Sequence, residues 1–168
     1  MWQYRWPTWV VAFFLAALFD VALLPAIFPA GYVPDLVLPL VVAFAFYETP
    51  ARGALLGAIG GLILDLTAGR LIGLNMTVYA GVGFLVGTLQ GKLVRDQIFV
   101  PGLTGAAMEV VTRLVLWVLV ALFGFPQSAH LFFAPLPVLV LFGLFMTPGL
   151  MGLLGFRPRH EVDASLKF

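Results

Sequence analysis

The sequence predicts an all-α polytopic membrane protein with six transmembrane helices. Hydrophobic residues make up 62% of the 168 residues and charged residues only 10%, whereas a soluble domain carries about 25% charged residues to keep its surface hydrated. A chain of this size exposes a large surface, and here that surface is mostly apolar, so lipid must surround it. The apolar runs are continuous and do not alternate, which favours helices over the strands of a membrane β-barrel.

Six apolar segments follow one another, separated by short breaks rich in Gly, Pro or charge. They cover residues 7–28, 34–48, 53–68, 72–91, 98–124 and 129–154, and residues 155–168 form a short cytoplasmic tail. The first segment is too long for the apolar region of a signal peptide and is followed by no A-x-A-like cleavage site, so we expect a retained span. A helix needs about 20 residues to cross the membrane. The second and third segments are shorter, so four full spans plus one re-entrant hairpin is an alternative.

The basic residues predict the orientation of these segments. With the N-terminus inside, the outer loops hold Arg70 alone, and the cytoplasmic segments hold Arg5, Arg52, Lys92, Arg95, Arg157, Arg159 and Lys167. Lys and Arg are enriched in cytoplasmic loops. Both termini are therefore expected in the cytoplasm of a protein in the bacterial inner membrane.

Glycines recur at four-residue spacing in two segments. The third segment carries Gly53, Gly57 and Gly61, and the fourth carries Gly83, Gly87 and Gly91. Glycines four residues apart lie on one face of a helix and let another backbone approach closely. We expect packing between helices of this chain; the alternative is that one stripe receives the membrane helix of a partner.

Two charged residues lie near the middle of the fifth segment. Glu109 and Arg113 are one helical turn apart, with the acid first, a spacing at which the two side chains can pair. Because a lone charge in the membrane is costly, we expect an intramembrane ion pair. A contact for the membrane segment of a partner, a polar hinge and a proton relay are the alternatives.

The predicted topology brings several polar residues to the outer face. This outer polar cluster comprises Asp20, Asp35, Asp65, Arg70 and Asn75, with Gln127 and His130 nearby. Asp35 follows Pro34 directly, a position typical of a helix N-cap, and Asp65 can pair with Arg70. Asp20 has no partner nearby in the sequence and must find one in space.

Composition argues against several other functions. A net charge of +1 provides no basic field for nucleic acid, and the absence of cysteine removes thiolate metal sites and cysteine nucleophiles. The sequence contains no nucleophile motif, no phosphate-binding Gly loop opening a helix and no metal-ligand spacing. We therefore expect no catalytic residue, no metal and no cofactor.

The stretch from Pro34 to about Gly87 resembles the rod shape-determining protein MreD family. The resemblance rests on short motifs: Pro34-Asp35-Leu36, Gly60-Gly61-Leu62-Ile63-Leu64-Asp65-Leu66, Gly69, Leu71, Gly73, Leu74 and Tyr79. Asp65, Gly69 and Gly73 are the motif positions that carry over from the family. The chain length, the six spans and the short charged tail agree with this family.

The resemblance implies a non-catalytic subunit of the bacterial elongation machinery, with a fold like the S-components of energy-coupling-factor transporters. The implied partners are membrane lipid and MreC, together with MreB, a RodA-type glycosyltransferase and a class B penicillin-binding protein that make peptidoglycan during elongation. One alternative is a true S-component for a vitamin or metal, because Ala12 and Ala16 resemble the docking surface of such proteins. Another is a small channel or ion-coupled carrier, although the polar residues do not form a continuous path.

Overall fold

The computed structural model describes residues 6–28, 32–68, 72–89, 99–124, 128 and 132–153, and this part of the chain contains helices and no strands. Each of the six predicted apolar segments contains a principal helix. In chain order these are α1 (Trp6–Leu18), which continues through a π-helical turn, η1 (Phe19–Leu23), into α2 (Leu24–Ile27), then α3 (Val37–Ala45), α4 (Pro50–Ala68), α5 (Leu74–Leu89), α6 (Phe99–Leu122) and α8 (Leu136–Leu153). The predicted all-α class is confirmed for the residues described.

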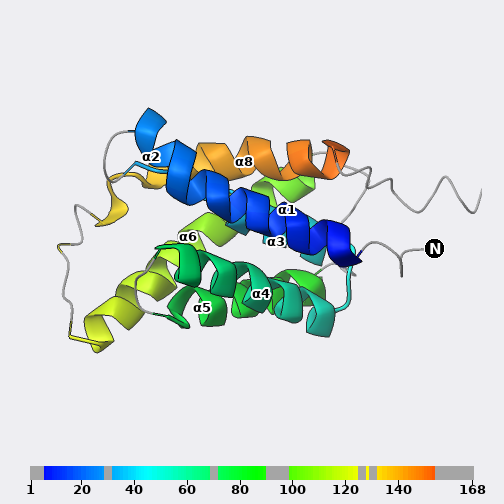
Figure 1. Cartoon of the computed structure of the whole chain (residues 1–168), viewed down its shortest axis with the longest axis horizontal. Helices are drawn as coiled ribbons and strands as arrows, with labels where there is room; N and C mark the ends of the chain where they lie inside the picture. Colours follow the sequence, from blue (N-terminus) through cyan, green and yellow to red (C-terminus); the bar gives the residue numbers. More distant parts are fainter. Residues whose placement is uncertain are drawn as a thin grey trace, which may run out of the picture.

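Successive helices run in opposite directions (Figure 1). The start of α1, the α3–α4 turn and the end of α8 therefore lie at one end of the bundle, on the right of the view. The start of α3 and the starts of α5 and α8 lie at the opposite end, on the left of the view. We call these the inner end and the outer end, after the predicted orientation of the chain.

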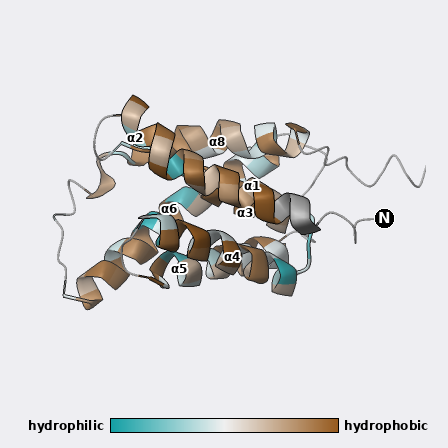
Figure 2. Cartoon of the chain, in the orientation of Figure 1, coloured by the Kyte–Doolittle hydropathy of each residue, from teal (hydrophilic) through white to brown (hydrophobic). Residues whose placement is uncertain are grey.

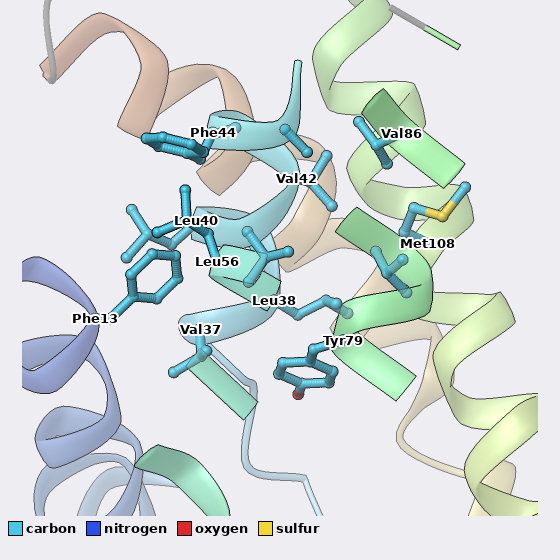
Figure 3. Close-up of a cluster of buried hydrophobic side chains, with 14 of the residues drawn as sticks. Phe13, Val37, Leu38, Leu40, Val42, Phe44, Leu56, Tyr79, Val86 and Met108 are labelled. Carbon is cyan, nitrogen blue, oxygen red and sulfur yellow. The ribbon is translucent and has the colours of Figure 1, made fainter. Parts of the chain in front are cut away.

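The helix α3 occupies the centre of the bundle and packs against α1, α4, α5, α6 and α8. All nine of its residues, Val37–Ala45, are buried, and a helix that is apolar on every side belongs inside a structure. Figure 3 shows its side chains packed between Phe13, Leu56, Tyr79 and Met108. At about 1.5 Å per residue α3 is only about 14 Å long, roughly half the thickness of the hydrocarbon core.

The outer faces of the bundle are apolar, as Figure 2 shows for α1, α5, α6 and α8. Among the described residues, three stretches are long and apolar enough to cross a membrane: Val10–Ile27, Phe99–Leu122 and Leu136–Leu153. Large side chains such as Phe145, which is 71% exposed, cover these faces. Apolar surface this extensive is not tolerated in water, which agrees with a membrane protein.

The π-helical turn η1 lies one turn before a proline. Pro25 has no N–H, and its ring crowds the carbonyl of Val21, four residues earlier. Just before this proline the helix takes the wider π form, in which the N–H of Leu24 bonds to the carbonyl of Phe19, five residues back. Asp20 lies in this turn and shares the buried face of the helix with Phe13 and Leu24. Such single π turns are frequent at functional sites.

Candidate functional site

Asp20 reaches across the bundle to the start of α3. Its Oδ1 accepts a hydrogen bond from the N–H of Leu36 at 2.8 Å, and its Oδ2 accepts one from the N–H of Val37 at 3.2 Å. The first N–H groups of a helix have no partner within the helix and carry partial positive charge, so a carboxylate is favoured there. The partner that Asp20 lacked in the sequence is therefore the N-terminus of α3, seventeen residues further along the chain.

Asp35 caps the same helix from within its own segment. Its Oδ1 accepts hydrogen bonds from the N–H groups of Val37 at 2.8 Å and Leu38 at 3.2 Å, which is the geometry of an N-cap. The carboxyl groups of Asp20 and Asp35 are adjacent. Two acidic side chains thus share one helix N-terminus at the outer end.

A cavity of about 360 Å³ opens beside these two carboxyl groups. Its lining is Asp20, Val21, Pro25, Val33, Pro34, Asp35, Leu64 and Asn75. The volume lies in the range of ligand pockets, and a mostly apolar wall with a few convergent polar groups is typical of such sites. We call this space the outer cavity.

Asp65 forms a second, tighter cap. Its Oδ2 accepts from the N–H groups of Gly73 at 2.8 Å and Met76 at 3.1 Å, while its Oδ1 accepts from the backbone N–H of Asn75 at 3.2 Å and its side-chain amide at 2.8 Å. Gly73 has φ +95°, which a residue with a side chain rarely adopts. Asp65 is fully buried, so it fastens the start of α5 to the end of α4.

The outer polar cluster is therefore divided into two parts. Asp20, Asp35 and Asn75 line the outer cavity, whereas all four hydrogen bonds of Asp65 go to residues at the start of α5. Five other predicted residues lie outside the described residues: Arg70, Gln127 and His130 at the outer face, Gly69 of the family motif and Gly91 of the second glycine stripe. Among the residues that are described, no group of three acidic or histidine side chains could hold a metal ion.

The two glycine stripes face each other across the α4–α5 pair. A Cβ at Gly53 would overlap the backbone of Gly83, and one at Gly57 would overlap the carbonyl of Tyr79. A Cβ at Gly87 would lie 2.7 Å from the Cα of Pro50. Glycine thus permits direct contact between the two backbones, and these faces are not free to receive a partner.

The helices α6 and α8 form a second closely packed pair. The four-residue spacing of glycines did not predict this pair. A Cβ at Gly102 would lie 2.5 Å from the carbonyl oxygen of Leu144, and one at Gly105 would overlap the hydroxyl of Thr147. On α8, a Cβ at Gly143 would lie 3.0 Å from Cγ of Glu109. The one sequence signal was the pair of glycines three residues apart near the start of α6, which share a helix face.

Glu109 and Arg113 do not form the predicted ion pair. In the described part of the chain the single side-chain salt bridge joins Arg52 and Glu48 at 3.1 Å, at the inner end. Glu109 is buried against α8, while the guanidinium of Arg113 lies 5.5 Å from the ring centroid of Phe132. The spacing places both residues on one face, but the longer side chain of Arg113 turns to an aromatic ring, which attracts a cation.

Ala12 and Ala16, which suggested a docking surface like that of an S-component, pack against the buried core. They face inward together with Phe13 and Ala17. The outward face of α1 is formed instead by large apolar side chains: Val10, Val11, Phe14, Leu15 and Leu18. A small-residue docking surface on α1 is therefore not available to a partner.

The chain was compared with protein families, with curated proteins and with solved structures. A family model described as rod shape-determining protein MreD matches residues 2–154, nearly the whole chain. No curated protein and no solved structure matches it. The expected likeness to the S-component fold therefore stays a prediction.

Proposed function

Because the chain belongs to the rod shape-determining protein MreD family, we propose that it is a non-catalytic membrane subunit of the machinery that elongates the bacterial cell. The observation that carries this proposal is the family match over residues 2–154. The family is one of membrane proteins that determine cell shape, and the apolar outer faces of α1, α6 and α8 suit that setting.

The main partner in this proposal is MreC, bound within the inner membrane. Both termini lie in the cytoplasm, so the outer end of the bundle faces away from it, as the distribution of basic residues favours. Through MreC the protein supports peptidoglycan synthesis by a RodA-type glycosyltransferase and a class B penicillin-binding protein. MreB completes the assembly on the cytoplasmic side.

The outer cavity is the surface that we propose for MreC. The glycine stripes of α4 and α5 already contact each other. The surfaces that remain for a partner are therefore the lipid-facing ones and this cavity. The cavity combines acidic groups, Asp20 and Asp35, with apolar walls that include Val21 and Pro25. A membrane helix that continues into a polar segment can place its apolar side chains against these walls and its polar groups against the two acidic side chains.

Filling the cavity tests this assignment without touching the caps of α3. Val21→Trp places a large side chain in the cavity wall, where valine is 39% exposed. Val115→Trp on α6 is a matched control, because Val115 is 40% exposed and does not line the cavity. We expect Val21→Trp to reduce co-purification of MreC and Val115→Trp to leave it unchanged.

Two results would count against the proposal, and they are distinct. If MreC fails to co-purify with the unchanged protein, binding of MreC is refuted. If MreC binds equally to the unchanged protein and to Val21→Trp, the partner is right and the docking surface is wrong.

A further inference from the structure

Three buried side-chain oxygens in the described part of the chain have no hydrogen-bond partner. They are Oε1 of Glu109 and the hydroxyl oxygens of Thr112 and Thr147, whose residues are 3%, 4% and 0% exposed. All three residues belong to α6 or α8. An unpartnered polar atom is costly inside a membrane protein, because no water is present to bond to it.

The close packing of α6 and α8 concentrates oxygen atoms between them. On α6, Gly105, Glu109 and Thr112 share one face by their spacing of four and three residues. The Cβ position of Gly105 lies against the hydroxyl of Thr147 and 2.8 Å from the carbonyl oxygen of Gly143. A side-chain oxygen and a backbone oxygen of α8 therefore meet α6 at the same point.

Pro148 supplies a further acceptor on α8. Proline has no N–H, so the carbonyl of Leu144, four residues earlier, loses its usual donor within the helix. That carbonyl oxygen lies 2.5 Å from the Cβ position of Gly102, so it faces α6. The contact region, which we call the α6–α8 seam, holds the side chain of Glu109, the hydroxyl group of Thr147 and two backbone carbonyls facing α6.

Oε1 of Glu109 accepts no hydrogen bond from the residues that the structure describes. Arg113 is close enough to interact electrostatically with both Glu109 and Asp35, but its guanidinium lies over Phe132 and forms no salt bridge with either within the described residues. Within the described residues, Oε1 of Glu109 and the hydroxyl groups of Thr112 and Thr147 thus have no hydrogen-bond partner.

We propose that the α6–α8 seam binds a monovalent alkali cation, with sodium as the probe, through Glu109, Thr147 and the carbonyl oxygen of Gly143. The donors are all oxygens, which suit hard cations and not the transition metals that favour nitrogen and sulfur. The seam holds one carboxyl group, whereas calcium sites use several acidic side chains. Carbonyls freed at interrupted membrane helices coordinate sodium in other membrane proteins.

The experiment is thermal unfolding of the purified full-length protein in detergent. The sodium chloride concentration is raised, with choline chloride keeping the ionic strength constant. At a sodium concentration ten times Kd, binding to the folded state alone raises the folding equilibrium constant about elevenfold, which is measured as an increase in Tm. Glu109→Gln and Thr147→Val should each remove the increase.

Thr104→Val is the matched control. Thr104 is a buried threonine on α6, but its hydroxyl donates to the carbonyl of Val100 at 2.8 Å, so its loss should leave the sodium effect intact. Broadening of the ²³Na NMR signal by the unchanged protein is a second measurement that needs no variant. A Tm that is equal in sodium and choline, or a sodium effect that survives Glu109→Gln, overturns the proposal. A Tm that responds to pH and not to sodium assigns the seam to a proton, and overturns it as well.

Discussion

Replacing Asp65 by Asn should destabilise the protein much more than the same replacement at Asp35. Asp65 receives four N–H bonds, two on each oxygen. An asparagine keeps one acceptor oxygen and turns its own NH₂ group toward the other two donors. Each buried donor left without an acceptor costs about 1–3 kcal/mol, so Asp65→Asn should reduce the free energy of unfolding by about 2–6 kcal/mol.

The other two caps provide internal controls of nearly the same chemistry. Asp35 uses Oδ1 for both of its bonds, and asparagine is as good an N-cap as aspartate. Asp35→Asn should therefore cost less than about 1 kcal/mol. Asp20 uses one bond on each oxygen. An asparagine oxygen can keep the N–H of Leu36, and the N–H of Val37 still bonds to Asp35 at 2.8 Å, so Asp20→Asn should also cost less than about 1 kcal/mol.

The assay is SDS titration in mixed micelles, with unfolding followed by tryptophan fluorescence. Asp65→Asn should lose clearly more stability than either Asp35→Asn or Asp20→Asn. An Asp65→Asn variant as stable as Asp35→Asn would refute the reasoning that both oxygens of Asp65 bind the start of α5.

Two further predictions compare neighbouring positions in the same helices. Gly57→Ala should destabilise by about 1–3 kcal/mol, because its Cβ would overlap the carbonyl of Tyr79. By contrast Gly81→Ala, with nothing within 4 Å, should stabilise by about 0.5–1 kcal/mol; equal effects in the same titration would contradict the packing of α4 on α5. Leu56→Ala should cost about 2–5 kcal/mol because Leu56 is 0% exposed. Leu55→Ala, at a position 50% exposed, should cost far less, and a reversed order would mean that the buried face of α4 is misassigned.

Several parts of the fold followed from local sequence patterns. The continuous apolar runs marked the helices, and the glycines at four-residue spacing marked the faces of α4 and α5 that approach closely. The capping role of Asp35 followed from its place directly after Pro34. These features depend on residues close together in the chain, so their physical cause is visible in the sequence.

The features that depend on spatial arrangement were not predictable in this way. Nothing near Asp20 in the sequence shows that its carboxylate bonds to the N–H of Val37, because that contact depends on how the first helix packs on α3. The predicted pairing of Glu109 with Arg113 was wrong because spacing fixes the helix face and not the side-chain direction. The α6–α8 seam depends on glycines that lie far apart in the sequence, such as Gly105 and Gly143, and meet only when the two helices pack.

The orientation of the outer cavity is the claim that cysteine accessibility tests most directly. Since the chain contains no cysteine, Tyr32→Cys before α3 and Glu48→Cys in the α3–α4 turn each introduce a unique thiol. A membrane-impermeant maleimide applied to intact cells should label the cysteine at position 32, and should label the one at position 48 only after the membrane is opened. Labelling of position 48 and protection of position 32 in intact cells would place the cavity on the cytoplasmic side and contradict the account.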